Sequence, residues 1–214
     1  SQPYYLNTKN LVKHLLMAAL TGFGKTTFFR NLMRALNKLG NKFIAIDFKR
    51  DTRTLMKEIP MLILRFNEHA TFKINPLQAI PGVSRIEQFN LFINILAETT
   101  FLMDGSQSLL LDHRVQLDKQ KKGQITIHDL YQSIQNAKLK TPRPLAWRDS
   151  CLRALRTMIT SFGEITNCTE GIPITALADH NIVLELDEAG AFKSYWGTLI
   201  PAYYLKWKIS NNIR

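Results

Sequence analysis

Apolar side chains recur at every third or fourth position across residues 28–39, which is the spacing of one face of an α-helix. Gly40 follows this pattern and predicts the end of the helix. Two continuous apolar runs flank the helix, at residues 15–18 and 43–46, and each predicts a short buried strand. Strand, helix and strand in this order indicate the opening unit of a parallel α/β sheet.

The rest of the chain continues to mix short strand patterns with longer helical ones. Further strands are expected at 61–64, 71–74 and 181–186, and helices at 52–58, 84–101, 106–116, 127–136, 147–159 and 195–207. Ser84, followed three residues later by Glu87, predicts a capping box at the start of one helix. Pro142 and Pro144 predict a break between two others.

The junction between the first strand and the first helix has the form of a phosphate-binding loop. The residues expected to hold nucleotide are Thr21, Gly22, Phe23, Gly24, Lys25, Thr26 and Thr27. In such a loop the backbone N–H groups surround phosphate oxygens, and a helix N-terminus points at them. We expect Lys25 to reach the β- and γ-phosphates of ATP and Thr26 to bind Mg²⁺. Ala19 departs from the motif, which has glycine there, and a simple strand–turn–helix junction is the competing interpretation.

Carboxylates follow two of the strand patterns. Asp47, Lys49 and Asp51 form a charged cluster just after the strand at 43–46, where open α/β sheets place their ligands. The alternative is a solvated turn. Asp187 and Glu188 end the apolar run at 181–186 and resemble a Walker B pair, which would support Mg²⁺ and polarise the attacking water. The alternative is that Asp187 and Glu188 simply begin the next turn.

Composition narrows the classes of protein that the sequence allows. A chain of 214 residues with 45% hydrophobic residues is large enough for one packed domain with an insertion. No apolar run reaches the roughly 18 residues of a membrane span, so no membrane partner is expected. Two cysteines and five scattered histidines form neither a disulfide framework nor a metal-ligand set. A cytoplasmic location is therefore predicted.

The formal net charge of +11 favours a polyanionic partner. Basic residues gather at 119–122 and again at 143–156. No zinc finger or base-reading helix accompanies them, so we expect DNA to be contacted through its phosphates and without regard to sequence. General solubility is the alternative explanation of the charge. For Arg148, Arg153 and Arg156, a solvated helix face with salt bridges is the alternative to phosphate contacts.

Several segments in order resemble the DNA-translocating ATPases of the HerA/FtsK type, and in particular the bacterial HerA-like branch related to conjugation ATPases. The matching segments are residues 5–6, 14–16, 21–27, 46–51, 75–77, 81–84, 147–149 and 183–187. The resemblance implies an α/β fold: the RecA-like parallel sheet of a P-loop NTPase with an inserted helical subdomain. We expect residues 1–80 to form the core around the phosphate loop, 81–170 the helical insertion, and 171–214 a further core strand and helix.

The resemblance also implies a function, and it implies that part of the family's catalytic machinery is missing from this chain. It implies an ATP- and Mg²⁺-dependent motor that moves DNA as a ring, plausibly a homohexamer, with a nuclease or effector partner. In the family, the strand that matches residues 183–187 precedes the true Walker B strand, so hydrolysis by this chain alone is expected to be poor. This makes Lys25 the strongest catalytic candidate and Asp187 and Glu188 weaker ones. A non-hydrolysing ATP-binding scaffold in a nuclease or antiviral complex, and a P-loop kinase or transferase, are the alternatives.

Overall fold

A three-stranded parallel sheet organises the protein, which is seen in a computed structural model that describes residues 16–18, 20 and 22–213. Its strands are β1 (Ile44–Asp47), β2 (Leu62–Arg65) and β3 (Ile182–Glu185), in the order β1-β3-β2. The last strand in sequence is therefore the central one, and all four of its residues are buried. Three of the strands predicted from apolar runs are confirmed.

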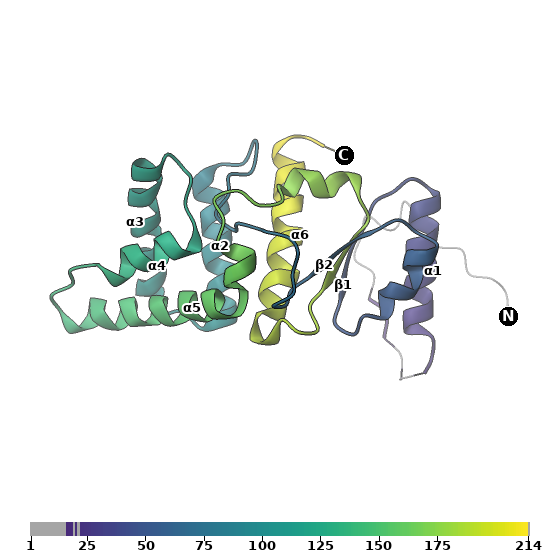
Figure 1. The fold of residues 1–214 in the computed structure, drawn as a ribbon, viewed down its shortest axis with the longest axis horizontal. Coiled ribbons are helices and arrows are strands. Elements are labelled where there is room, and N and C mark those ends of the chain that lie inside the picture. The colour runs from purple at the N-terminus through teal and green to yellow at the C-terminus, as the bar shows by residue number, and fades with distance from the viewer. Residues whose placement is uncertain (1–15, 19, 21, 214) are drawn as a thin grey trace.

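Helices form most of the remaining described chain. They are α1 (Lys25–Lys38), α2 (Arg85–Thr100), α3 (Asp104–Lys121), α4 (Ile127–Gln135), α5 (Pro142–Thr166) and α6 (Lys193–Ser210). Shorter 3₁₀ segments are η2 (Asp51–Lys57), η3 (Ile174–Asp179) and η4 (Gly190–Phe192). The sheet lies between α1 on one side and α6 on the other, with α2 to α5 beyond α6 (Figure 1). The helical segment expected at 52–58 is a 3₁₀ turn, and the other predicted helices are present.

An aromatic cluster on α6 joins the sheet to the helical region. The Trp196 ring lies 4.7 Å from that of Phe66, just past β2, and 5.7 Å from that of Phe162 in α5. Tyr195 lies 6.3 Å from Phe92 of α2, measured between ring centroids. Tyr195 and Trp196 are fully buried, so a single hydrophobic core includes side chains from the sheet and from the helices packed beyond α6.

Close packing of α6 on the sheet depends on Gly197. A Cβ at this position would lie 3.2 Å from the Leu186 side chain and 3.5 Å from that of Ile46. The missing methyl group therefore allows the helix backbone to approach β1 and the end of β3 closely. By contrast, no residue of α1 is buried on the other side of the sheet.

Helix caps differ from those expected. Ser84 does precede α2, but its side chain makes no capping hydrogen bond, so the predicted box with Glu87 is wrong. A complete capping box is found at α4 instead, where the Thr126 hydroxyl accepts the Asp129 N–H and the Asp129 carboxylate accepts the Thr126 N–H. Aspartate performs here the reciprocal role that the sequence argument gave to glutamate.

The strand expected at 71–74 is absent, and the hydrogen bonds of this segment explain why. The Ile74 N–H donates to the Ile165 carbonyl at 2.9 Å, and the Lys73 carbonyl accepts the Ile172 N–H at 2.8 Å. These partners belong to the last turn of α5 and the segment after it, so residues 73 and 74 are paired with the helical region and not with the sheet. Tertiary contacts have overridden its strand propensity.

Of the strand expected at 15–18, residue 15 lies outside the described residues, and residues 16–18 adopt no regular structure. Helices α2 to α5 lie between β2 and β3 in sequence, as the expected insertion would, while the domain limits 1–80, 81–170 and 171–214 stay a prediction. Across the described chain, every helix is too short or too polar to cross a membrane.

Candidate phosphate-binding site

The predicted phosphate loop turns directly into α1. Gly22 and Gly24 have φ angles of +86° and +82°, in the left-handed region that favours glycine. A Cβ at either position would meet nothing within 4 Å, so the requirement for glycine comes from the backbone conformation and not from space. Gly24 is the N-cap of α1, and Lys25 is the first helical residue. The local sequence thus produces the turn that the motif requires, while Thr21 lies outside the described residues.

The N-terminus of α1 is suited to an anion. Its first turn contains no acidic residue, so none of its own side chains competes for the exposed N–H groups. The Lys25 ammonium donates to the Leu20 carbonyl at 2.8 Å, and the same carbonyl accepts the Phe23 N–H at 3.3 Å. Lys25 therefore folds back against the residue that precedes the loop.

Several side chains of the loop are exposed. Phe23 exposes 73% of its surface, so the residue offers its backbone while the ring faces away from the core. Thr26 and Thr27 are also exposed. Nowhere in the described chain do three or more His, Cys, Asp or Glu side chains gather into a possible metal site. The exposed Thr26 hydroxyl in the first turn of α1 would hold Mg²⁺ together with the nucleotide phosphates, and these residues fit Mg·ATP.

A groove of about 440 Å³ runs between α1 and β1, and it begins beside the loop. Its polar lining comes from Thr26 and Arg30 of α1 and from Asp47, Asp51 and Thr52. Its apolar lining consists of Phe29, Leu32, Met33, Leu36, Phe43, Ile44, Ala45 and Ile46. The structure thus brings Thr26 to the same groove as Asp47 and Asp51, which the sequence placed together at a strand end.

Asp47 is held as an acceptor by the chain that follows it. Its carboxylate accepts the Lys49 N–H at 2.9 Å, the Thr52 N–H at 2.8 Å and the Thr52 hydroxyl. Burial opposes ionisation of this group, but the hydrogen bonds from Thr52 and Lys49 outweigh it, so the pKa of Asp47 is lowered. Asp47 is therefore an anion that anchors the start of η2 beside the groove.

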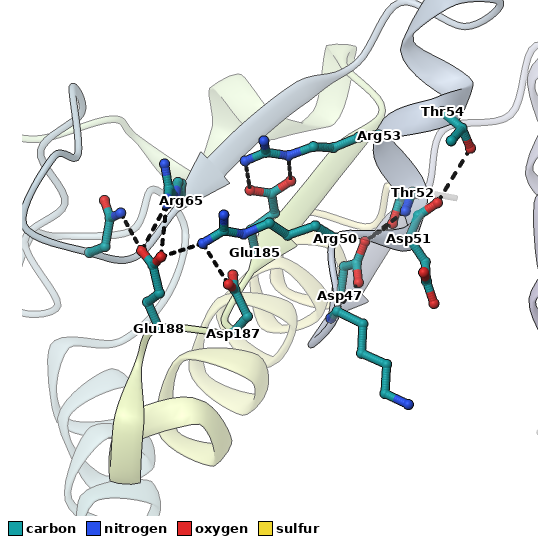
Figure 2. Close-up of polar contacts among 12 residues, drawn as sticks. Asp47, Arg50, Asp51, Thr52, Arg53, Thr54, Arg65, Glu185, Asp187 and Glu188 are labelled. Atoms are coloured by element: carbon teal, nitrogen blue, oxygen red, sulfur yellow. Dashed lines mark hydrogen bonds and ion pairs between the residues drawn. The ribbon is translucent and has the colours of Figure 1, made fainter.

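Arginine–carboxylate pairs occupy the carboxyl ends of the three strands (Figure 2). Arg53 donates two hydrogen bonds to the two oxygens of Glu185, each at 2.6 Å. Arg50 lies 2.6 Å from an oxygen of Asp187 and also contacts Glu188. Arg50 has a φ of +58°, which is uncommon for a residue other than glycine. The local backbone is therefore strained at the position from which Arg50 reaches both acids.

Glu188 is the most heavily contacted of these acids. Besides Arg50, Arg65 donates to both of its oxygens at 2.9 Å, and the Asn67 amide donates to one of them. The hydrogen bond from Asn67, followed by those from Arg50 and Arg65, lowers the pKa of Glu188 to about 2. A carboxylate with so low a pKa is a weak acceptor for a proton from water.

The predicted catalytic residues therefore lie in two different surroundings. Lys25 and Thr26 stand at the loop and groove, whereas Asp187 and Glu188 are absent from the groove lining and are engaged by arginines. A catalytic role for Asp187 and Glu188 stays a prediction, and the geometry gives both acids structural partners.

Arg50, Arg65 and Asn67 were not among the site residues predicted from the sequence. All three follow or end a predicted strand, as Asp187 and Glu188 do. Because the carboxyl ends of parallel strands meet at one edge of a sheet, opposite charges at several strand ends were the available signal.

The fold of this chain is similar to that of a known protein. Neither a protein-family model nor a curated protein matches the sequence. Among solved structures, VirB4 of Thermoanaerobacter pseudethanolicus matches 87% of this chain with a TM-score of 0.65 and 17% sequence identity. The match covers 55% of the VirB4 chain, so this chain spans about half the length of that protein. At this identity the likeness concerns the fold, and it is consistent with an α/β fold of the P-loop NTPase kind.

Proposed function

We propose that the chain is the ATP-binding part of a motor ATPase, with Mg·ATP held by residues 21–27. The observation that carries this proposal is the loop itself: two left-handed glycines deliver Lys25 and Thr26 to the first turn of a helix that bears no competing acid. The likeness of the fold to that of VirB4 also supports this proposal.

Each residue of the loop has a distinct task in this proposal. The N–H groups from Gly22 to Thr27 donate to phosphate oxygens, and Lys25 exchanges its bond to the Leu20 carbonyl for the β- and γ-phosphates. Thr26 offers its hydroxyl to the metal, which neutralises charge on the phosphates when bound. Asp47, which its hydrogen bonds keep ionised, lines the same groove as Thr26.

We further propose that the motor belongs with the HerA-like translocases and acts on DNA in the cytoplasm. In this proposal it works as a ring, plausibly a homohexamer, with a nuclease or effector partner. The ordered motifs support the family, and the net charge of +11 supports a nucleic-acid partner.

One observation favours a second candidate, an ATP-binding scaffold without turnover. Arg50 and Arg65 hold Asp187 and Glu188, and within the described chain these are the acids that sequence reasoning offered for activating water. A chain that binds ATP without a free catalytic carboxylate would use nucleotide to order an interface.

The decisive experiment is Mg·ATP titration of the chain and of its Lys25→Ala variant by calorimetry. Removal of the ammonium should weaken affinity at least about tenfold, or about 1.4 kcal/mol, without lowering the melting temperature of the nucleotide-free protein. Lys38→Ala, at the opposite end of α1, is the matched control and should bind as the unaltered chain does. Unchanged ATP affinity in a folded Lys25→Ala protein would rule out the loop as the site.

A further inference from the structure

The end of the molecule farthest from α1 is strongly basic. It is formed by the connection between α4 and α5 (Figure 1). We call residues 131–157 the α4–α5 arm; this stretch holds six basic residues and one acid, Asp149. The basic residues are Lys138, Lys140, Arg143, Arg148, Arg153 and Arg156. Such an excess on one extension departs from the chain as a whole, where 28 basic residues face 17 acidic ones.

Carboxylates neutralise little of this charge. Among the described residues, Arg148 is the member of the six with an acidic partner, Asp149, at 3.4 Å. Arg153 donates to the Thr100 carbonyl at 2.8 Å, which leaves its charge uncompensated. Lys138, Lys140 and Arg143 are exposed at the tip. The pairs at the carboxyl ends of the strands show the opposite arrangement, with each of three arginines held by an acid.

Two arginines of the arm also lie over aromatic rings. The Arg143 guanidinium is 5.8 Å from the centroid of the Trp147 ring. Arg156 is 6.0 Å from the centroid of the Tyr131 ring and donates to its hydroxyl at 3.1 Å. Both rings are half-buried, so each of these two arginines lies beside an aromatic side chain that is packed into the fold.

Gly105 holds one of these supports in place. A Cβ on Gly105 would fall 2.0 Å from an atom of the Trp147 ring, so the ring packs directly on the backbone of α3. The Ser106 hydroxyl donates to the Trp147 carbonyl at 3.1 Å and fixes the same turn of α5.

We propose that the α4–α5 arm is a binding site for single-stranded DNA. Exposed lysines and arginines neutralise successive phosphates, and unpaired bases stack on the Arg143–Trp147 and Arg156–Tyr131 pairs. Single strands are favoured over duplexes because only unpaired bases offer their faces for stacking. The inference rests on the proposed function for the choice of DNA as the polyanion, but it does not depend on ATP binding.

The test measures binding of a fluorescent 20-nucleotide dT strand by anisotropy at several salt concentrations. In the variant Lys138→Gln/Lys140→Gln/Arg143→Gln, affinity should fall about tenfold or more, and the slope of log affinity against log salt should shrink by about 2, since each single-strand contact contributes about 0.7. The control Lys38→Gln/Lys42→Gln/Lys57→Gln makes the same change in charge on the α/β part. It should leave both quantities within about twofold of those of the unaltered chain.

A charge-preserving variant tests the stacking separately. Arg143→Lys/Arg156→Lys keeps the salt slope but removes the planar guanidinium groups, so affinity for dT should drop several-fold while affinity for a 20-base-pair duplex is unchanged. Circular dichroism and ATP titration of each variant establish that the fold and the phosphate loop are intact. Lys25→Ala should bind dT normally, which separates this site from the nucleotide site.

Equal losses in the arm variant and the control would overturn the inference, because they would reflect net charge alone. So would absence of dT binding at low salt, or equal affinities for dT and duplex that Arg143→Lys/Arg156→Lys leaves unchanged.

Discussion

Loss of Arg53 is expected to destabilise the protein far more than loss of Arg34, although both arginines make the same kind of contact. Arg53 donates two hydrogen bonds to Glu185 at 2.6 Å, and Arg34 donates two to Glu58 at 2.6 and 2.8 Å. The pairs differ in burial: the Glu185 side chain is 0% exposed and that of Glu58 is 49% exposed. The two pairs therefore have nearly the same hydrogen-bond distances and differ in the exposure of the carboxylate.

The burial of Glu185 sets the magnitude. Arg53→Ala leaves an ionised carboxylate without its cation, and breaking a buried pair in this way costs about 3–5 kcal/mol. The Arg53 side chain is 43% exposed, so water can enter the vacated space, and we expect the lower end, about 3 kcal/mol. An exposed pair such as that of Arg34 contributes about 0.2–1 kcal/mol. For a chain of this size, the melting temperature should fall by roughly 6–12 °C for Arg53→Ala and by at most about 4 °C for Arg34→Ala.

Thermal and urea unfolding, followed by circular dichroism, measure both changes. Glu185→Gln in the Arg53→Ala background should recover part of the loss, because a neutral amide is cheaper to bury than an unpaired carboxylate. Similar shifts for Arg53→Ala and Arg34→Ala, or no recovery on adding Glu185→Gln, would refute the argument from burial.

Three further predictions concern other parts of the structure. Gly105→Ala should destabilise the protein by about 1–3 kcal/mol in urea unfolding, because the added methyl group overlaps the Trp147 ring; stability equal to that of the unaltered chain would contradict this packing. Glu188 has a folded pKa of about 2 against an ordinary 4.5, so the unfolded state binds more protons between these values and stability should fall as the pH drops through that window. Glu188→Gln should flatten the pH dependence of unfolding there, and an unchanged profile would argue against the ion pairs. The 214-residue chain should hydrolyse ATP barely above background, and robust Mg²⁺-dependent turnover that Glu188→Gln abolishes would instead make Asp187 and Glu188 catalytic.

The sequence predicted those elements whose signals are local. Apolar residues at every third or fourth position located the six helices of the described chain, and short apolar runs located its three strands. The turn at Gly22 and Gly24 and the start of α1 were also predictable, because both are determined within a few residues. Residues 71–74 failed for the opposite reason: their hydrogen-bond partners at 165 and 172 lie about 90 to 100 positions away in the chain.

In the candidate site, too, the contacts that the sequence did not predict join residues far apart in the chain. Arg50 and Asp187 are 137 positions apart and are joined only because β1 and β3 are neighbours in parallel register, Asp47 beside Glu185. The Walker B motif is defined by its carboxylates alone. In this protein the strand register also brings Arg50, Arg53 and Arg65 to the edge of the sheet where these carboxylates lie. Three cations beside three acids form compensated pairs, and the lowered pKa of Glu188 follows from its partners. Strand-end acids in this protein therefore have to be interpreted together with the basic residues at the ends of neighbouring strands, since their combination decides whether a carboxylate is available for chemistry or is held in an ion pair.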